Sequence, residues 1–249
     1  MAVVLVTGGT GTLGRVLVPL LVANGHEVRV LSRRSAPSLP DGATPCSGDV
    51  RTGEGIEAAV VGADVVVHAA TSPRRHVRDT EVEGTRRVAA AVAATGSHLI
   101  YVSIVGVDRH RYPYYRAKRD AELVVESSGA PWTVLRATQF HDLIDAILGG
   151  RWFIRTPHMR LQPVAVTEVA RRLADLVEGR PQCLALDFGG PEIADLRELA
   201  ATRRAVRGRA ARLVPVPPMG FLSDFEAGRQ LTPEHRDGTI TYREWLDRR

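Results

Sequence analysis

A glycine-rich segment near the start of the chain constrains its fold more than any other feature. Residues 7–14 read Thr-Gly-Gly-Thr-Gly-Thr-Leu-Gly, after the apolar run Val3–Val6 and at the start of the helix-like segment Leu13–Ala23. Glycine lets a pyrophosphate approach the backbone where a Cβ would collide, and a helix N-terminus supplies amide donors. Between a strand and a helix, the pattern predicts a dinucleotide-binding loop. Its predicted cofactor contacts are Thr7, Gly8, Gly9, Thr10, Gly11, Thr12, Leu13 and Gly14.

Short apolar runs rich in β-branched residues alternate with helix-length segments through the first part of the chain. Strands that alternate with helices pair in parallel, because each crossover helix returns the chain to the same edge of the sheet. The sequence therefore predicts an α/β fold with a Rossmann-type doubly wound parallel sheet. Strands are predicted at Val3–Val6, Val28–Leu31, Val65–Val67, Leu99–Val102 and Thr133–Leu135, and helices at Leu13–Ala23, Gly55–Val61, Val77–Ala94 and Tyr114–Ser127.

The alternation weakens after residue 137, where prolines divide the chain into short pieces. Helices are predicted at Thr167–Glu178, Asp195–Val206 and Tyr242–Arg248, and we expect no continuation of the sheet. We predict a dinucleotide-binding core at 1–137 and a small substrate-binding lobe at 138–249. The lobe is expected to interleave with the core, in one structural unit, and to cover the carboxyl ends of the strands, where doubly wound proteins bind ligands.

Two arginines follow the second predicted strand, where the chain reads Ser32-Arg33-Arg34. NAD-specific sites usually place a carboxylate here, which accepts hydrogen bonds from the ribose 2′-hydroxyl. Guanidinium groups instead form charge-assisted, often bidentate bonds to the 2′-phosphate of NADP. The sequence therefore predicts NADP(H) as the cofactor. NAD(H) stays open as an alternative, because one or both arginines can simply point to solvent.

Two further turns are predicted to face the cofactor, because both follow parallel strands at the same sheet edge. Asp49 is expected to accept from the adenine amino group with Val50 against the ring, and small residues after the fourth strand leave room for the ribose and nicotinamide. We expect His68, at the end of that strand, to be a hydrogen-bonded histidine rather than an acid or base. The predicted contacts in these turns are Gly48, Asp49, Val50, Ala69, Ala70 and Thr71.

Taken together, these residues resemble the short-chain dehydrogenase/reductase superfamily, and specifically its extended or atypical branch of NmrA-like NAD(P)-binding proteins. The similarity covers nearly the whole chain. Besides the glycine-rich segment, the matching motifs are Gly48-Asp49-Val50, His68-Ala69-Ala70, Val82-Glu83-Gly84-Thr85, Tyr114-Tyr115-Arg116-Ala117-Lys118, the segments 135–140 and 162–166, and Gly189-Gly190-Pro191.

The resemblance implies a catalytic group. Tyr114 and Lys118 match the superfamily's Tyr-x-x-x-Lys pair, in which the ammonium favours the phenolate and bonds the nicotinamide ribose. Tyr115 is an alternative to Tyr114, since its spacing from Lys118 also suits one helix face. Ser103 matches the third member, whereas Ile104 stands where extended members commonly carry a second hydroxyl. The segment beyond the sixth strand implies substrate contacts from Gln139, Phe140 and His141.

The function implied is an NADPH-dependent oxidoreductase that reduces a carbonyl or quinone-like small molecule. A second hypothesis is a regulator that senses NADP(H) and binds a protein partner without turnover, motivated by Ile104. A sugar-nucleotide epimerase or dehydratase is a third. The short segment between Ser103 and Tyr114, and the lack of an evident diphosphate-binding basic cluster, count against it.

Charge and composition narrow the expected partners. The net charge is +5, yet the basic cluster contains no aromatic residue, so we expect a solvated helix face rather than a phosphate-binding patch, and no nucleic-acid partner. No apolar run approaches the ~20 residues that cross a bilayer, so no membrane partner is expected. A strand-like start without a signal peptide favours the cytoplasm. The basic cluster comprises Arg203, Arg204, Arg207, Arg209 and Arg212.

The two cysteines, Cys46 and Cys183, have no metal-ligand spacing, so we predict buried thiols and no metal. The oligomeric state is left as monomer or homodimer. The helix Val77–Ala94 and the one after Tyr114 suit the four-helix contact of dimeric relatives, but Arg86 and Arg87 keep a monomer open.

Overall fold

A doubly wound sheet is the main element of the fold. The computed structural model describes residues 1–34, 36–150 and 152–249. Within these ranges seven strands form one sheet in the order β3-β2-β1-β4-β5-β6-β9. The strand order reverses direction between β1 and β4, which confirms the predicted Rossmann-type α/β fold. The strands are β1 Val3–Thr7, β2 Glu27–Ser32, β3 Ala43–Ser47, β4 Val65–His68, β5 His98–Ile104, β6 Trp132–Ala137 and β9 Ala185–Phe188.

The register of the sheet brings the carboxyl ends of its central strands to one edge. β1 pairs in parallel with both β2 and β4, so that Thr7 lies opposite Leu31 on one side and His68 on the other. β2 with β3 and β4 with β5 are also parallel pairs. The loops that follow β1, β2, β3, β4 and β5 therefore all leave the sheet at the edge where such folds bind ligands.

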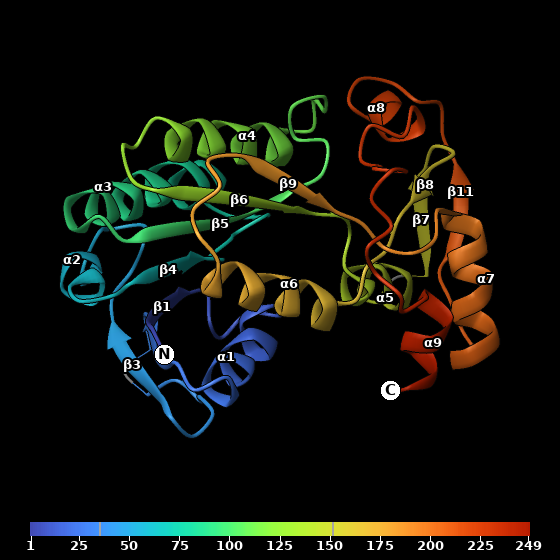
Figure 1. The fold of residues 1–249 in the computed structure, drawn as a ribbon. Helices are drawn as coiled ribbons and strands as arrows, with labels where there is room; N and C mark the ends of the chain where they lie inside the picture. The colour runs from blue at the N-terminus through green and yellow to red at the C-terminus, as the bar shows by residue number, and fades with distance from the viewer. Residues whose placement is uncertain (35, 151) are drawn as a thin grey trace. The chain divides into compact units, whose positions relative to one another are not determined.

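Helices cover both faces of this sheet. In Figure 1, α3 and α4 lie on one face, and α1 and α6 lie on the other. Their inward residues are aliphatic, and the core between α3 and the sheet includes Leu5, Val66, Val88 and Leu99. The helices are α1 Gly14–Ala23, α2 Ile56–Val60, the π-helix η1 Asp79–Gly84, α3 Thr85–Thr95, α4 Pro113–Glu126 and α6 Val166–Glu178.

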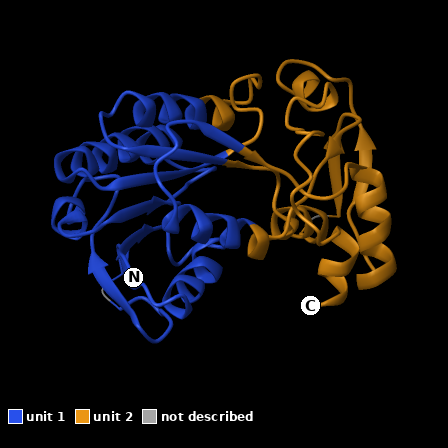
Figure 2. Ribbon diagram, viewed as in Figure 1, with its two compact units in different colours: residues 1–103, 117–135, 169–186 blue, residues 104–116, 136–168, 187–249 orange. Residues whose placement is uncertain are grey.

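The chain divides into two compact units, coloured separately in Figure 2. Unit 1 comprises residues 1–103, 117–135 and 169–186, and it holds most of the sheet. Unit 2 comprises residues 104–116, 136–168 and 187–249. Both units are therefore assembled from three separate stretches of sequence.

Unit 2 has an apolar core of its own, formed mainly by three helices. Ile144, Leu199 and Trp245 are among its buried residues. Capping boxes begin two of these helices, with Asp195 and Thr241 as the N-caps. The elements are α5 His141–Gly149, β7 Phe153–Thr156, β8 Arg160–Leu161, β10 Ala194–Asp195, α7 Leu196–Arg207, β11 Arg212–Pro215, α8 Leu222–Glu226 and α9 Tyr242–Asp247; β7 pairs with β11 and β8 with β10.

Three expectations from the sequence were wrong. β9 adds a strand to the sheet beside β6, because α6 is a crossover helix that returns the chain to the sheet edge. Cys183 is exposed and Cys46 is only half-buried, so neither is the buried thiol that we predicted. Arg203 does not belong to a solvated face: it is buried, and its Nε lies 2.8 Å from Asp145 Oδ1.

The described residues lack two other features, a membrane-spanning helix and a metal-binding cluster. Those residues contain no helix that is both long and apolar enough to cross a membrane. They contain no group of three or more histidine, cysteine or acidic side chains arranged to hold a metal ion.

Candidate functional site

Close packing within the chain requires most of the glycines in the loop after β1. A Cβ on Gly8, whose φ is +74°, would lie 2.6 Å from the carbonyl oxygen of Ala69. A Cβ on Gly9 would lie 2.6 Å from a side-chain methyl group of β2, and one on Gly14 would collide with the backbone of Gly8 and Gly9. Gly11 differs, because it is exposed and a Cβ there would approach only Gly8 O, at 3.2 Å.

The loop therefore presents an open side at Gly11, next to the start of α1. The N-cap of α1 is Leu13, whose side chain makes no capping hydrogen bond. The positive end of the helix dipole favours an anionic ligand here, while the amides of Gly11, Arg15 and Leu17 already donate to backbone carbonyls. Thr10 is half-buried and Thr12 is exposed beside them. The exposed backbone of Gly11 and the positive helix end fit a pyrophosphate group.

At the carboxyl end of β2, Arg33 and Arg34 are exposed. The Arg34 amide donates to the buried Ser32 Oγ at 3.1 Å. In the next turn the carboxylate of Asp49 is already partnered locally: Oδ1 accepts from the Arg51 amide at 2.9 Å, and Oδ2 lies 3.7 Å from Arg51 Nε. The proposed adenine contact of Asp49 would have to share these partners, and it stays a prediction.

The other predicted contacts lie at the same edge of unit 1. Gly48 and Val50 are buried after β3, and a Cβ on Gly48 would collide with a backbone carbonyl of its own turn. After β4, Ala69 and Ala70 are half-buried and Thr71 is exposed. The structure thus gathers the predicted cofactor residues along the ends of β1, β2, β3 and β4.

His68 joins this edge to α3 through hydrogen bonds on both ring nitrogens. Its Nδ1 lies 2.6 Å from Thr7 Oγ1, and its Nε2 lies 3.0 Å from Thr85 Oγ1. Burial, and secondarily the charge of Lys118, lower the pKa of His68 to about 3. The expectation of a hydrogen-bonded histidine is confirmed, and the neutral ring links Thr7 on β1 to Thr85 on α3.

This burial predicts a pH dependence of stability. An unfolded histidine takes up a proton below a pKa of 6.5, whereas the buried ring of His68 stays neutral until about 3. The contribution to stability is complete above 6.5 and is lost as the pH falls from 6.5 toward 3. Because of His68 alone, we expect the free energy of unfolding to be about 2 kcal/mol lower at pH 5 than at pH 7.

Urea unfolding of wild type and two variants at pH 7 and pH 5 checks this prediction. His68→Asn should show a smaller difference between the two pH values, and His235→Asn, at an exposed histidine, should match wild type. An unchanged pH dependence in His68→Asn would contradict it.

Lys118 is buried in a mainly polar setting that reasoning from sequence did not anticipate. Its Nζ donates to Val102 O at 2.6 Å, lies 3.3 Å from Glu81 Oε2, and stands 4.2 Å from the ring centre of Tyr101. Lys118 is 3% exposed and Glu81 is 0% exposed, so this ion pair is shielded from water. Beside it, Ser103 Oγ is buried and accepts or donates no hydrogen bond among the described residues.

The two neighbouring tyrosines at the start of α4 have different surroundings. Tyr115 is buried and packs against His110 and Phe225, with ring centres 4.5 and 6.1 Å away. Burial also raises the pKa of Tyr115 well above its ordinary value. Tyr114 is half-buried in the first turn of the helix, four residues before Lys118. Tyr115 is thus the less accessible of the two, and the role of Tyr114 as the reactive phenol stays a prediction.

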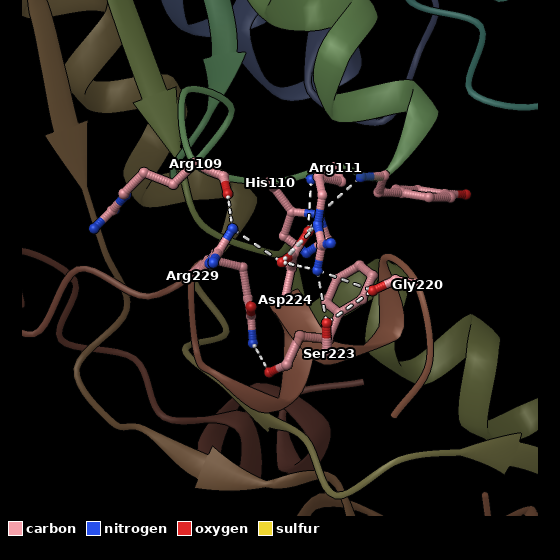
Figure 3. A network of polar contacts seen from close by, with 10 residues as sticks. Arg109, His110, Arg111, Gly220, Ser223, Asp224 and Arg229 are labelled. Carbon is pink, nitrogen blue, oxygen red and sulfur yellow. Dashed lines mark hydrogen bonds and ion pairs between the residues drawn. The ribbon is translucent and has the colours of Figure 1, made fainter. Parts of the chain in front are cut away.

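A buried carboxylate anchors the segment that leads into α4, as Figure 3 shows. Asp224, 1% exposed, accepts from the Arg111 amide at 2.8 Å and from both sides of the Arg111 guanidinium at 2.9 Å. Arg229 Nη1 lies 3.0 Å from the same carboxylate and donates to Arg109 O at 2.8 Å. Hydrogen bonds from Arg111 hold the pKa of Asp224 down at about 2. The short segment between Ser103 and Tyr114 is thus tied to α8.

Two of the three predicted substrate contacts serve the fold of unit 2. Gln139 is buried, and its Nε2 donates to Gln230 O at 3.3 Å. His141 is fully buried, and its Nε2 lies 2.9 Å from Ile240 O. Phe140 is half-buried at the N-cap of α5. The substrate role of all three stays a prediction, and Phe140 is the one whose side chain is partly accessible.

Comparisons with known proteins identify the family. The NAD(P)H-binding family profile matches residues 8–179. The chain belongs to this family and, within the short-chain dehydrogenase/reductase superfamily, to the atypical NmrA-like branch. Its coenzyme is accordingly a nicotinamide dinucleotide.

Individual relatives differ in what their names describe. The chain is 30% identical to a (4-alkanoyl-5-oxo-2,5-dihydrofuran-3-yl)methyl phosphate reductase of Streptomyces griseus, over 84% of this chain and 75% of that protein. It is 34% identical to the photosystem II assembly factor Ycf39 of Trieres chinensis, over 55% of this chain and 46% of that protein. An uncharacterized Mycobacterium tuberculosis protein is 38% identical over 41% of this chain, which spans only 12% of that relative's length.

Among solved structures, UDP-glucose 4-epimerase of Thermus thermophilus in complex with NAD has a similar fold. The TM-score is 0.73 at 20% identity, with 98% of this chain and 97% of that chain covered. This likeness shows the shared fold.

Proposed function

We propose that the chain is an NADPH-dependent oxidoreductase that reduces a carbonyl or quinone-like small molecule. The observation that carries this proposal is the buried ammonium of Lys118, which lies at the end of β5 and on the helix that also carries Tyr114. Beside it is the hydroxyl of Ser103, which has no hydrogen-bond partner in the described part of the chain. A buried charge is costly, so a site that maintains one is a candidate for chemistry. The similarity to the Streptomyces reductase over most of the chain supports the same class.

The proposed roles follow from the chemistry of carbonyl reduction. When bound, the reduced coenzyme supplies hydride to the carbonyl carbon. Tyr114 donates a proton to the carbonyl oxygen, and Ser103 donates a hydrogen bond to that oxygen as negative charge develops there. Lys118 stabilises the phenolate that remains.

The proposal is tested by NADPH consumption with a panel of aldehydes, ketones and quinones, followed by absorbance. Turnover of at least one substrate that requires NADPH supports it. Tight coenzyme binding without turnover of any substrate would instead favour the regulator described below.

Arg33 and Arg34 are proposed to select the phosphorylated coenzyme. Both are exposed at the end of β2, and the sequence has no acidic residue at positions 32–36, where NAD-specific sites usually place one. We expect the double variant Arg33→Ala/Arg34→Ala to bind NADPH about 10- to 100-fold more weakly, because charge-assisted hydrogen bonds are lost, with little change for NADH. Calorimetric titration with both coenzymes measures the ratio.

Arg15 supplies the matched control for this prediction. It is an exposed arginine on α1, and its Nε donates to Thr10 O at 3.0 Å. Arg15→Ala should weaken NADPH and NADH binding to a similar extent. An equal loss of both coenzymes in the Arg33/Arg34 variant would refute the selection of the 2′-phosphate.

A second candidate function is a regulator that binds NADP(H) and a protein partner without turnover. The observation that favours it is Ile104 beside Ser103, which leaves one hydroxyl at the end of β5. The similarity to an assembly factor over half of the chain is consistent with it. Such a regulator requires different partner affinity in its NADP+ and NADPH forms. Equal affinity of a captured partner for both forms would exclude it.

The remaining assignments are proposals that rest on the same reasoning. Residues 138–249 are proposed to contribute substrate contacts, and 1–137 to hold the coenzyme. A cytoplasmic location and a monomeric or homodimeric state complete the proposal. Size-exclusion chromatography with light scattering tests the last point.

A further inference from the structure

Glu81 lies between the lysine of the proposed site and the loop after β4, and no motif considered in the sequence assigns it a role. Its Oε1 accepts from Thr71 Oγ1 at 2.6 Å and from the Ser72 amide at 2.8 Å. Its other oxygen, Oε2, lies 3.3 Å from Lys118 Nζ and has no hydrogen-bond partner among the described residues. One buried carboxylate therefore touches two parts of the proposed coenzyme site.

Three different groups contact the Lys118 ammonium. These are the carbonyl oxygen of Val102, the carboxylate of Glu81 and the ring face of Tyr101. Of the three, Glu81 alone carries a formal negative charge. Burial without a counter-ion disfavours the charged form of an ammonium, so such a group loses its proton more readily. Glu81 is thus the counter-ion among the three groups that contact this buried ammonium.

The backbone around Glu81 is also unusual. Glu81 lies in η1, a π-helical turn that runs directly into α3. Such turns are rare and frequently occur at functional sites. Here the turn places a carboxylate in the interior of the unit, where burial of a charge is costly unless it is paired.

We propose that Glu81 is the positioning residue of the coenzyme site: it holds Lys118 as an ammonium and fixes the Thr71–Ser72 loop, so that coenzyme affinity does not depend on pH. The inference rests on the proposed function insofar as Lys118 contacts the coenzyme. It extends that function, because it makes Glu81, a residue of a different element, responsible for the charge state of Lys118.

The ionisable groups that face Lys118 keep a constant charge over the pH range of the experiment. Besides Glu81 on η1, they are His68 on β4 and Tyr101 on β5, while Glu122 on α4 acts on Tyr101. His68 has a pKa of about 3, and burial raises the pKa of Tyr101 well above 10. Neither changes charge between about pH 6.5 and about pH 9.

The experiment measures NADPH affinity by coenzyme fluorescence from about pH 6.5 to about pH 9. Wild type should keep one affinity within about twofold across this range. Glu81→Gln preserves the shape and removes the charge, so its affinity should fall by about tenfold as the pH rises and the ammonium is lost. The pH dependence should vanish in Glu81→Gln/Lys118→Met. Glu83→Gln is the matched control, at an exposed glutamate two residues along the same turn.

Thermal unfolding of the coenzyme-free protein gives a second measurement. In Glu81→Gln a lysine that releases its proton on folding binds fewer protons than the unfolded chain, so stability rises with pH. The deficit in melting temperature relative to wild type should therefore be largest near pH 6.5 and narrow toward pH 9. A constant deficit, together with a coenzyme affinity that parallels wild type, overturns the role of Glu81. Absence of NADPH binding by wild type overturns the proposed function instead, and the unfolding data still decide whether Glu81 holds the charge.

Discussion

Replacing Tyr114 with phenylalanine is expected to lower NADPH-dependent turnover by about 100- to 10,000-fold, the usual contribution of a positioned general acid. The substitution removes one hydroxyl from a half-buried side chain in the first turn of α4. Because the ring remains, we expect the fold and coenzyme affinity to be retained. The loss should appear mainly in kcat, since a proton is transferred only as the reaction proceeds.

Turnover and coenzyme titration should be measured on the same preparations. Tyr112→Phe serves as the matched control, because Tyr112 is a half-buried tyrosine on the segment just before α4. It should retain turnover within about twofold if the Tyr114 hydroxyl alone acts as the acid. Equal rates for wild type and Tyr114→Phe would remove this residue from the mechanism.

A methyl group added to the coenzyme loop should have the second large effect. Gly8→Ala places a Cβ 2.6 Å from Ala69 O and 2.7 Å from the Ala70 amide nitrogen, at a φ of +74°. Both obstacles are backbone atoms, so the loop must move away from β4. We expect coenzyme affinity to fall by at least about 100-fold, because the amides that would hold the pyrophosphate lose their alignment.

A substitution at a second glycine distinguishes the effect of this collision from the effect of backbone strain. Gly25 also has a positive φ, +83°, but a Cβ there meets nothing within 4 Å. Gly25→Ala should therefore cost about 1–2 kcal/mol of stability, the cost of left-handed backbone for alanine, and leave coenzyme affinity unchanged. Gly8→Ala should melt at a lower temperature than Gly25→Ala and bind far more weakly. Equal coenzyme affinity in the two variants would show that the loop does not hold the coenzyme as proposed.

Reasoning from sequence was most successful where the signal is local. The strand–glycine loop–helix unit is contiguous from Val3 to Ala23, and each of its parts has its own pattern. The helix predicted at Thr167–Glu178 begins one residue earlier in the structure. β9 was missed because its four residues, which follow Pro181 and precede two glycines, carry too little pattern to indicate a strand.

The polar partners of the site were missed for a different reason. Asp224 and Arg111 are 113 residues apart, and nothing near either residue indicates the other. Glu81 lay beside the Val82–Thr85 motif, but an acid in a charged helix ordinarily predicts a solvated position. Its only local signal was its place beside apolar Val82 and three residues before the motif's glycine, which does not distinguish burial from exposure.

The amino-acid sequence by itself determined the class of fold, the position of the coenzyme loop and the Tyr114–Lys118 spacing, because these depend on residues that are neighbours along the chain. The tertiary structure alone decided which charges are buried together, that Glu81 pairs with Lys118 and that Asp224 anchors the segment before α4. Such pairs form only when distant segments exclude water between them, and the energy of an ion pair depends on that exclusion far more than on residue type.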